Sequence, residues 1–440
     1  MLKGQTGAPP WGGRAPFKFT SGLSMKERLS TLYLDCKRAG PPNFIVDTVL
    51  RGVLGYQDGD RPPRLLRNNA RLQALFAELH DPYAALSYGA DWREAFVASP
   101  SLAVEVCYIH DLFHLARCLL WLRNYDLIVI SHVATGDDMS LLLQYAHRFD
   151  RRRAPLVVFL GNEYDLLDEK IGFIRGVEAE FVCSQLPIAA AHALYRECEG
   201  SRILALPHAL NPNQYCPIPN SARQVDIGFI GDIYWPFIGD RERTELIEWF
   251  EAHGSSRGLQ CAIRKERVPR EAWSRFLGGC KAIIGAESGT YYLNDRGRLL
   301  QRARAYNLYE NQAADFDEVF DRFYQCEERT LSGKCISSRH FEPIGTKTCQ
   351  MLLKGHYNGI LEADRHYIAI NKDLTNINEA IERFRDESYR TQMVEETYDY
   401  VLSQHTYAHR VEHLLGIVTS TARAECSTEA SRSATVSEGT

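Results

Sequence analysis

A glutamate, a tight turn and small polar residues follow one another in the segment SSRHFEPIGTKTCQMLLKG, residues 337–355. Glu342 precedes a Pro-Ile-Gly turn, and an ionised carboxylate can accept hydrogen bonds from sugar hydroxyls. The stretch TKTCQMLLKG predicts a helix whose first amides, at Gly345, Thr346 and Lys347, would hold phosphate oxygens, with Arg339 and Lys347 adding positive charge. The alternative is that Thr346 only caps a helix and Glu342 is solvated.

A second candidate position is a glycine in GFIGDIYWP, where Gly231 follows a predicted strand. Glycine lets the backbone approach a ligand closely, although a tight strand-to-helix turn explains Gly231 equally well. The sequence contains no G-x-x-x-x-G-K-[ST], and no third glycine opens a helix after Gly231. Phosphate-loop and dinucleotide fingerprints are therefore absent.

The elements that would position these residues alternate between short apolar runs and helical segments, which is typical of mostly parallel sheets. The first set of predicted strands is SLAVEVCYI, YDLIVISH, APLVVFLG, AEFVCS and RILALP. The second set is VDIGFIG, LQCAIR, CKAIIGAE, NGILEA and HYIAIN. The sequence therefore predicts an α/β protein with two doubly wound sheets in tandem.

The domain boundary is expected in HALNPNQYCPIPNSARQ, near residue 222, where prolines and polar residues separate the two sets. Helical spacing of apolar residues in MKERLSTLYL and RLLRNNARLQALFAELH predicts a helical preface to the first domain. The expected organisation is a disordered N-terminus 1–22, a first domain 23–222, a second domain 223–418 with a helical insertion 296–335, and a disordered tail 419–440.

Composition narrows the class of protein. The 440 residues carry a net charge of -5, so we expect no general attraction to nucleic acid. No apolar run is long enough to span a bilayer and the start lacks a signal peptide, which predicts a soluble cytoplasmic protein. The 12 cysteines form no C-x-x-C pair, so we expect buried free thiols in preference to disulfides or zinc.

Several segments together resemble one family. They are DIGFIGDIYWP, GAESGTYYLND, SSRHFEPIGTKT, GHYNGILEADRHYIAINKDLTNINEAI and QHTYAHRVEHLL. They are similar to the CgeB-like, group 1 branch of the GT-B glycosyltransferases over residues 225–415, and LPHALNPNQYCP resembles the linker that ends GT-B amino-terminal domains. The resemblance implies a GT-B-like fold, with two Rossmann-like domains facing a cleft and a final helix that crosses back to the first domain.

The resemblance also implies a donor site on the second domain. Glu342 matches the first glutamate of the family's donor-binding motif, while Gln350 stands where the family has a second glutamate that binds ribose. The family stabilises the leaving diphosphate with basic side chains and helix amides, without an obligatory metal or other cofactor. Arg264 and Lys265 are candidates beside Arg339, although the charged run RKER could instead be solvated.

Candidate catalytic residues stand at the ends of predicted strands. Glu287 ends CKAIIGAE, where it could bind donor hydroxyls or stabilise a turn. On the acceptor side, His132 lies in VISHVATGDD, and Glu163 and Asp165 lie in FLGNEYDLLDEK. A histidine or a carboxylate there could act as the general base that an inverting transferase needs.

Together these features predict a metal-independent glycosyltransferase of hexosyltransferase type. It would move a sugar from a nucleoside diphosphate sugar to a glycan, lipid-linked or protein acceptor in polysaccharide or glycoconjugate synthesis. A sugar-nucleotide epimerase of the same fold and a non-catalytic sugar-nucleotide-binding protein are the alternatives. The run of three arginines at residues 151–153 leaves peripheral contact with a membrane open.

Overall fold

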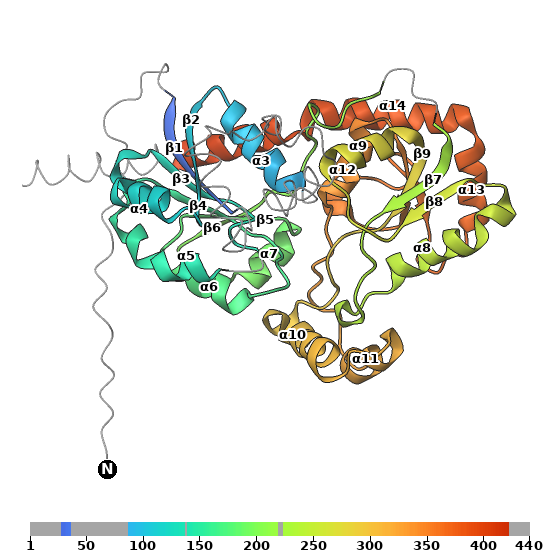
Figure 1. Ribbon diagram of the computed structural model, residues 1–440, viewed down its shortest axis with the longest axis horizontal. Helices are drawn as coiled ribbons and strands as arrows, with labels where there is room; N and C mark the ends of the chain where they lie inside the picture. The colour runs from blue at the N-terminus through green and yellow to red at the C-terminus, as the bar shows by residue number, and fades with distance from the viewer. Residues whose placement is uncertain (1–27, 37–86, 137–138, 219–222, 422–440) are drawn as a thin grey trace, which may run out of the picture.

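Two parallel sheets with helices on their faces lie side by side in the computed structural model (Figure 1), which describes residues 28–36, 87–136, 139–218 and 223–421. This arrangement confirms the predicted α/β class and the two Rossmann-like domains. The predicted disordered segment 1–22 lies outside the described residues. Of the predicted tail, residues 419–421 continue a helix and the rest is not described.

The first sheet has the strand order β2-β1-β3-β4-β5-β6, with all neighbours parallel. Its strands are β1 (Leu29–Asp35), β2 (Leu102–Tyr108), β3 (Leu127–Ile130), β4 (Leu156–Phe159), β5 (Phe181–Ser184) and β6 (Arg202–Ala205). Its helices are α3 (Ser87–Ala98), α4 (Leu112–Leu120), α5 (Ser140–Tyr145), α6 (Leu167–Gly176) and α7 (Ile188–Leu194). The inner strands β3 and β4 are apolar throughout because both of their faces are buried.

The second sheet has the order β11-β10-β9-β7-β8, again parallel. Its strands are β7 (Val225–Ile230), β8 (Cys261–Arg264), β9 (Cys280–Gly285), β10 (Cys349–Leu353) and β11 (Ile368–Ile370). Its helices are α8 (Glu242–His253), α9 (Arg270–Gly279), α12 (Ser338–Gly345), α13 (Ile377–Arg385) and α14 (Glu387–Gln404). In such doubly wound sheets the ligand crevice lies where the strand order reverses, which here is between β7 and β9.

A helical insertion extends from the second domain between β9 and α12. It contains α10 (Arg298–Ala305), a π-helical turn over Tyr306–Glu310 and α11 (Phe316–Phe323). These helices project away from the second sheet, toward α6 of the first domain (Figure 1). Arg296, just before α10, forms an ion pair with Asp168 of α6 at 2.5 Å, so the insertion contacts the first domain.

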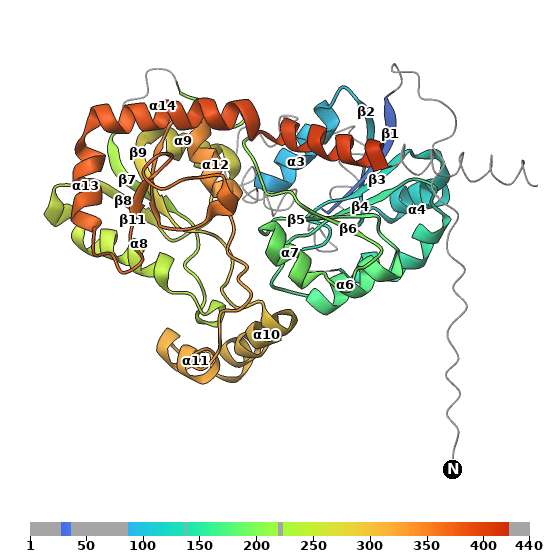
Figure 2. The ribbon, with the colours of Figure 1, turned by 180° about the vertical axis from the view of Figure 1, so that it is seen from behind.

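The end of the chain returns to the first domain, as the resemblance predicts (Figure 2). After α14, residues 407–421 form another helix. Its buried residues Tyr407, Val411 and Leu414 pack in the same cluster as Trp92 of α3 and Phe159 of β4. None of the helices in the described ranges is both long and apolar enough to cross a membrane.

The predicted helical preface is wrong at its start. Residues 29–35 form strand β1, which lies inside the first sheet and is buried on both faces. A strand of that kind loses the alternating pattern of a half-buried strand, and its apolar residues then coincide with helical spacing. The remainder of the preface, residues 37–86, lies outside the described part of the chain.

The order of helix and strand after residue 337 is also the reverse of the prediction. TKTCQMLLKG contains the buried strand β10, and the helix is α12, which comes before it and includes Pro343. Proline inside a helix costs about 3 kcal/mol, and for this reason the Pro-Ile-Gly sequence indicated a turn. Burial of Phe341 and Ile344 in the core holds α12 in place despite Pro343.

The predicted strand NGILEA is absent. Residues 357–359 form a 3₁₀ turn, in which Asn358 and Gly359 have φ of 55° and 72°. Backbone with positive φ does not continue a strand. The short β11 pairs directly with β10 and forms the edge of the second sheet.

Candidate active site

A cavity of about 640 Å³ lies between the two domains. The first domain lines it with residues that follow β4 and β5, among them Asn162, Asp165 and Gln185. The second domain lines it with the ends of β7 and β9 and with the start of α12. The cavity therefore opens at the carboxyl ends of both sheets, where doubly wound folds bind ligands.

The floor on the second domain is shaped by Gly231, the residue after β7. Its φ is 156°, a conformation that L side chains rarely adopt, and its amide donates to Arg264 O at 3.1 Å. Gly231 lines the cavity, as the sequence analysis expects for a glycine close to a ligand. The backbone is therefore open to the cavity beside the switch point of the sheet.

Helix α12 begins at the cavity, and His340 fixes its start. The Ser337 amide donates to His340 Nδ1 at 3.0 Å, so the neutral ring carries its proton on Nε2, which lies 3.0 Å from Ala286 O at the end of β9. Burial lowers the pKa of His340 to about 4. Ser337, Ser338 and Arg339 line the cavity, so the positive end of the helix dipole faces it.

Two guanidinium groups at the cavity have buried N–H groups without a hydrogen-bond partner among the described residues. They are Arg339 Nη1 and Arg243 Nε. The Arg339 guanidinium stacks on Trp273, with Cζ 4.3 Å from the ring centroid, and that of Arg243 stacks on Tyr234 at 3.6 Å. Stacking orients the planar groups while leaving their edges available, and buried unsatisfied donors favour an anionic ligand.

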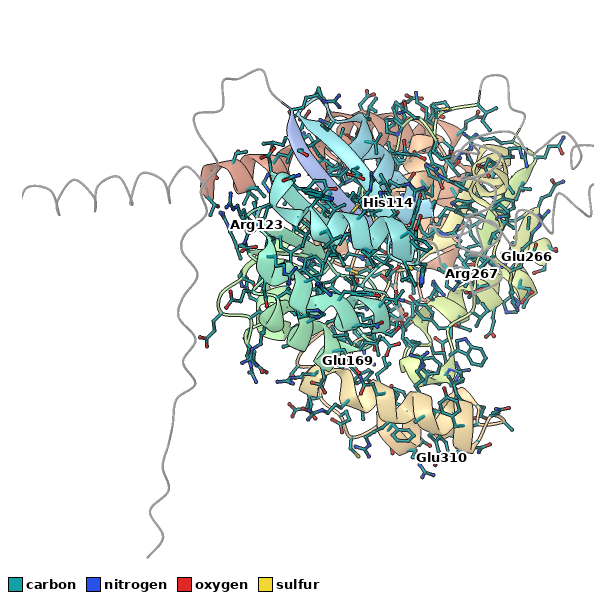
Figure 3. The ribbon with its side chains drawn as sticks, turned by 60° about the vertical axis from the view of Figure 1, so that its left-hand side comes forward. His114, Arg123, Glu169, Glu266, Arg267 and Glu310 are labelled. Atoms are coloured by element: carbon teal, nitrogen blue, oxygen red, sulfur yellow. The ribbon has the colours of Figure 1, made fainter. Side chains whose placement is uncertain are left out.

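Arg267 and Arg304 add two further arginines to the cavity wall, each with a carboxylate partner. Arg267, labelled in Figure 3, donates to Asp232 at 2.5 Å, and Arg304 of the insertion pairs with Asp165 of the first domain. Their charge is locally compensated. Arg339 Nε lies 3.9 Å from Glu342 Oε2, so its charge is partly compensated, and the remaining positive potential of the site comes from Arg339, Arg243 and the α12 N-terminus.

Residues 260–416 match the family model described as "Glycosyl transferase-like". The matched region runs from β8 to the helix after α14, and it includes Arg339 and the whole of α12. The second domain is therefore similar to glycosyltransferases. No curated protein matches the chain.

Several solved structures are similar to this chain over most of its length. One is Anabaena Alr3699/HepE in complex with UDP and glucose, with 10% identity and a TM-score of 0.46, over 89% of this chain and 100% of that one. An alpha-glucosyltransferase in complex with UDP and a 13-mer DNA shows 8% identity and a TM-score of 0.48, over 89% and 100%. The alpha,alpha-trehalose 6-phosphate synthase from Burkholderia multivorans shows 13% and 0.42, over 91% and 98%.

Glu342 lies in the glycosyl transferase-like region, but inside α12 and not ahead of a helix. It is buried, and its two carboxylate oxygens accept hydrogen bonds from Ser87 Oγ of α3 and Trp273 Nε1 of α9, both at 2.6 Å. Glu342 thus joins helices of the two domains. Its role as a sugar ligand stays a prediction, and a ribose would have to displace Ser87.

The predicted phosphate amides at Gly345, Thr346 and Lys347 are misplaced, because these residues end α12 instead of beginning a helix. The amides of Thr346 and Lys347 donate to Glu342 O and Ile344 O. Gly345 packs against the interdomain linker, where a Cβ would come within 2.4 Å of Tyr215 O. None of the three lines the cavity.

Four further donor-side candidates, like Lys347, lie outside the cavity. Lys347 pairs with Glu395, and Lys265 pairs with Glu251 at 2.6 Å. Arg264 is exposed and stands 5.7 Å from the Phe276 ring. Gln350 is buried on β10 and donates to His340 O at 3.0 Å, and Glu287 accepts from the Tyr357 amide at 2.7 Å. Of the donor-side candidates, Arg339 and Gly231 line the cavity, and their donor role stays a prediction.

On the acceptor side, Glu163 lines the cavity but is fully engaged within the first domain. Its carboxylate accepts hydrogen bonds from Ser184 Oγ at 2.7 Å, the Gln185 amide at 2.7 Å and Tyr195 OH at 2.8 Å. Burial raises the pKa of Glu163. These contacts give Glu163 a positioning function for the loop after β5.

His132 follows β3, as expected, and is buried behind the cavity wall. Its ring packs against Trp92, Phe159 and His208, with the His208 centroid 5.2 Å away. Burial and the neighbouring His208 hold the pKa of His132 well below its usual range. His208 lines the cavity and His132 does not, so His208 stands between His132 and a ligand.

Arg243 and the serines at the start of α12 are the site residues that sequence reasoning missed. Arg243 lies in the charged run GDRERTEL, which reads as a solvated helix face. The position of Arg243 in the chain could have identified it, because a basic residue in the first turn of the helix after β7 lies near the carboxyl end of that strand. Ser337 and Ser338 were hidden because the helix was placed too late in the chain.

Proposed function

We propose that this chain is a glycosyltransferase that moves a sugar from a nucleoside diphosphate sugar to an acceptor hydroxyl. One observation carries the proposal. Two guanidiniums with unsatisfied buried N–H groups, that of Arg339 at the N-terminus of α12 and that of Arg243 on α8, line the interdomain cavity. The diphosphate of a sugar nucleotide supplies the negative oxygens that such donors require. The glycosyl transferase-like match over residues 260–416 supports the same chemistry.

The charge that develops on the leaving diphosphate determines the mechanism. As the bond from the anomeric carbon to the phosphate oxygen breaks, negative charge grows on that oxygen. We propose that Arg339, Arg243 and the first amides of α12 stabilise this charge. In our proposal these cations and amides stabilise the negative charge that a divalent metal stabilises in other transferases, and the reaction is metal-independent.

The remainder of the cavity fits a donor with an acceptor beside it. Its volume of about 640 Å³ lies within the range of about 300–1,000 Å³ common for small-molecule sites. Tyr234, Trp235 and Phe237 offer aromatic surface on the donor side, and the loops after β4 and β5 face them from the first domain. We propose that the acceptor enters along these loops and that the pathway is polysaccharide or glycoconjugate synthesis.

A binding experiment with matched arginine and lysine variants tests the donor site. The full chain is titrated with UDP, GDP, ADP and dTDP sugars, with and without EDTA, by calorimetry and thermal shift. We expect one nucleotide sugar to bind equally well with EDTA. Arg339→Ala should weaken its affinity about tenfold or more, since hydrogen bonds to charged groups contribute about 1.5–3 kcal/mol.

The controls are Arg264→Ala and Lys347→Ala, which alter basic residues outside the cavity and should leave affinity unchanged. Turnover is followed as nucleoside diphosphate release, with the sugar product analysed with and without a glycan mixture. Sugar transfer that depends on added acceptor supports the proposal. Absence of nucleotide binding at millimolar concentration, or equal losses in Arg264→Ala and Arg339→Ala, would falsify the donor site.

A further inference from the structure

A cluster of metal-binding side chains lies on the first domain, away from the cavity. It consists of Cys107 on β2 and of His114 and Cys118 on α4. The Sγ atoms of the two cysteines and a ring nitrogen of His114 all lie within 4.8 Å of one another. None of these residues lines the interdomain cavity.

The spacing of the sequence explains why these groups converge. Side chains alternate along a strand, so Glu105 and Cys107 share one face of β2. His114 and Cys118 are four residues apart and share one face of α4. Asp111 caps the start of α4 by accepting from the His114 amide at 3.0 Å, and this fixes the phase of the helix relative to the strand.

Glu105 adds a carboxylate to the cluster. Its Oε1 lies 2.9 Å from His114 Nε2 and 3.7 Å from Cys118 Sγ. Tyr125 OH donates to the other oxygen, Oε2, at 2.5 Å, and so orients the carboxylate. Arg117 also pairs with Oε1, from an exposed side chain that can turn to solvent. The cluster therefore offers four candidate ligand atoms with an orienting hydrogen bond.

Two of the four side chains in the cluster are shielded from solvent, and the other two are accessible to an ion from solvent. Cys107 and Cys118 are buried, whereas His114 and Glu105 are partly exposed, at 26% and 36% of their side chains. Figure 3 labels His114 beside the blue and cyan strands of the first sheet. An ion can therefore enter from the His114 and Glu105 side and meet two thiols that are already shielded from solvent.

We propose that Cys107, Cys118, His114 and Glu105 bind one Zn²⁺ ion, which fastens α4 to the edge strand β2. Two thiolates, an imidazole and a carboxylate are all ligand types that Zn²⁺ binds, and four of them complete a tetrahedral set. With bonds of about 2.0–2.3 Å, tetrahedral ligand atoms stand about 3.3–3.8 Å apart. Since the ligand atoms of the two cysteines and His114 lie within 4.8 Å of one another, they reach this spacing by a contraction of at most about 1–1.5 Å.

The ligand chemistry selects zinc. Thiolates disfavour the hard ions Mg²⁺ and Ca²⁺, and a tetrahedral set with two sulfurs and one nitrogen suits Zn²⁺. The site has no open position for a substrate, so its function is structural. The proposal is independent of the donor site, and its test reads metal binding instead of sugar transfer.

Cobalt is the probe for the test, because tetrahedral Co²⁺ absorbs visible light strongly and Co²⁺–thiolate bonds give a near-ultraviolet charge-transfer band. The reduced, metal-free full chain is titrated with Co²⁺ and then with Zn²⁺. We expect both bands to saturate at one equivalent of Co²⁺ and to disappear when one equivalent of Zn²⁺ displaces it. Zn²⁺ should also raise the thermal midpoint of the protein by mass action.

Variants locate the site. Cys118→Ser should abolish most of the charge-transfer band, and His114→Gln, at a partly exposed position that tolerates the change, should weaken Co²⁺ affinity about tenfold or more. Cys183→Ser, which alters a buried cysteine of β5 outside the cluster, is the control and should keep both bands. A wild-type chain without the charge-transfer band, or a His114→Gln variant with unchanged Co²⁺ affinity, would overturn the proposal.

Discussion

Burial and one hydrogen bond decide what His208 can do at the cavity. Its Nδ1 accepts a hydrogen bond from Trp92 Nε1 at 3.1 Å, so the proton of the neutral ring is on Nε2. Burial, with the positive charge of Arg410, lowers the pKa of His208 to about 3. The ring is therefore neutral at physiological pH, and toward a ligand it is a hydrogen-bond donor, not a base.

The same burial makes the stability of the protein depend on pH. In the unfolded chain His208 regains a pKa near 6.5. Between pH 6.5 and 3 the unfolded state therefore binds a proton that the folded state excludes, so stability falls as the pH falls. We expect the free energy of unfolding to drop by up to about 1.4 kcal/mol per pH unit for this residue alone. Urea unfolding at pH 7.5, 6 and 5 measures the slope.

The variant His208→Asn isolates this contribution, because asparagine keeps an acceptor for Trp92 and does not titrate. Its stability should fall less steeply with decreasing pH than that of the wild type. His192→Asn, on the exposed face of α7, is the control and should keep the wild-type slope. Equal slopes in His208→Asn and wild type would show that His208 does not exclude the proton.

At the scale of elements, the end of α12 depends on a close approach to the linker. A Cβ at Gly345 would lie 2.4 Å from Tyr215 O and 2.6 Å from a methyl group of Leu210. The backbone oxygen cannot move away without shifting the linker, so we expect Gly345→Ala to destabilise the protein by about 1–3 kcal/mol. Thermal and urea unfolding measure this loss.

Gly172 supplies the matched control. It lies inside α6, is exposed, and a Cβ there would meet nothing within 4 Å. Gly172→Ala should therefore stabilise the protein by about 0.5–1 kcal/mol through helix propensity alone. If both alanine variants stabilised the protein, close packing at Gly345 would not be the reason for that glycine.

The strands that could be read from the sequence are those with clear ends. VDIGFIG and CKAIIGAE are apolar runs closed by a glycine or a carboxylate, and β7 and β9 lie where they predict. β1 was missed because burial on both faces removes alternation, and α12 was missed because Pro343 is typical of a turn. In both cases tertiary packing outweighs the local signal.

The residues of the candidate sites also differ in how well the sequence alone could predict them. Arg339 could be predicted because it lies within a motif of neighbouring residues, whereas Arg243 becomes visible only when α8 is placed after β7. The cluster around Cys107 escaped notice because its ligands follow strand and helix periods, with no C-x-x-C pair. To predict a site whose residues come from several helices and strands, the exact start of each element must be known, because it decides which side chains share a face. Sequence patterns do not define these starts to within one residue.

At the scale of the whole molecule, the two domains are joined behind the cavity by a buried polar contact. Arg270 of α9 pairs with Asp91 and, at 2.6 Å, with Glu94, both on α3. Asn211 of the linker donates to the same two carboxylates, each at 2.7 Å. Arg270 and Asp91 are nearly excluded from solvent, with 13% and 1% of their side chains exposed. The charge of Arg270 in the second domain therefore helps to hold the two domains in their relative orientation.

Removing that arginine should be costly, because it leaves Asp91 buried beside Glu94 without a cation. Breaking a buried pair from one side costs about 3–5 kcal/mol, and we expect Arg270→Ala to lose stability in this range by urea unfolding. Burial already raises the pKa of Asp91 to about 7, so without Arg270 this carboxyl must take up a proton or stay charged without a cation. Adding Asp91→Asn removes the carboxyl, so the double variant should be more stable than Arg270→Ala alone. Arg241→Ala breaks exposed pairs with Glu245 and Asp317 and should cost less than about 1 kcal/mol. If the Arg270 variant behaved like the Arg241 variant, the domains would be held together by apolar packing and not by this ion pair.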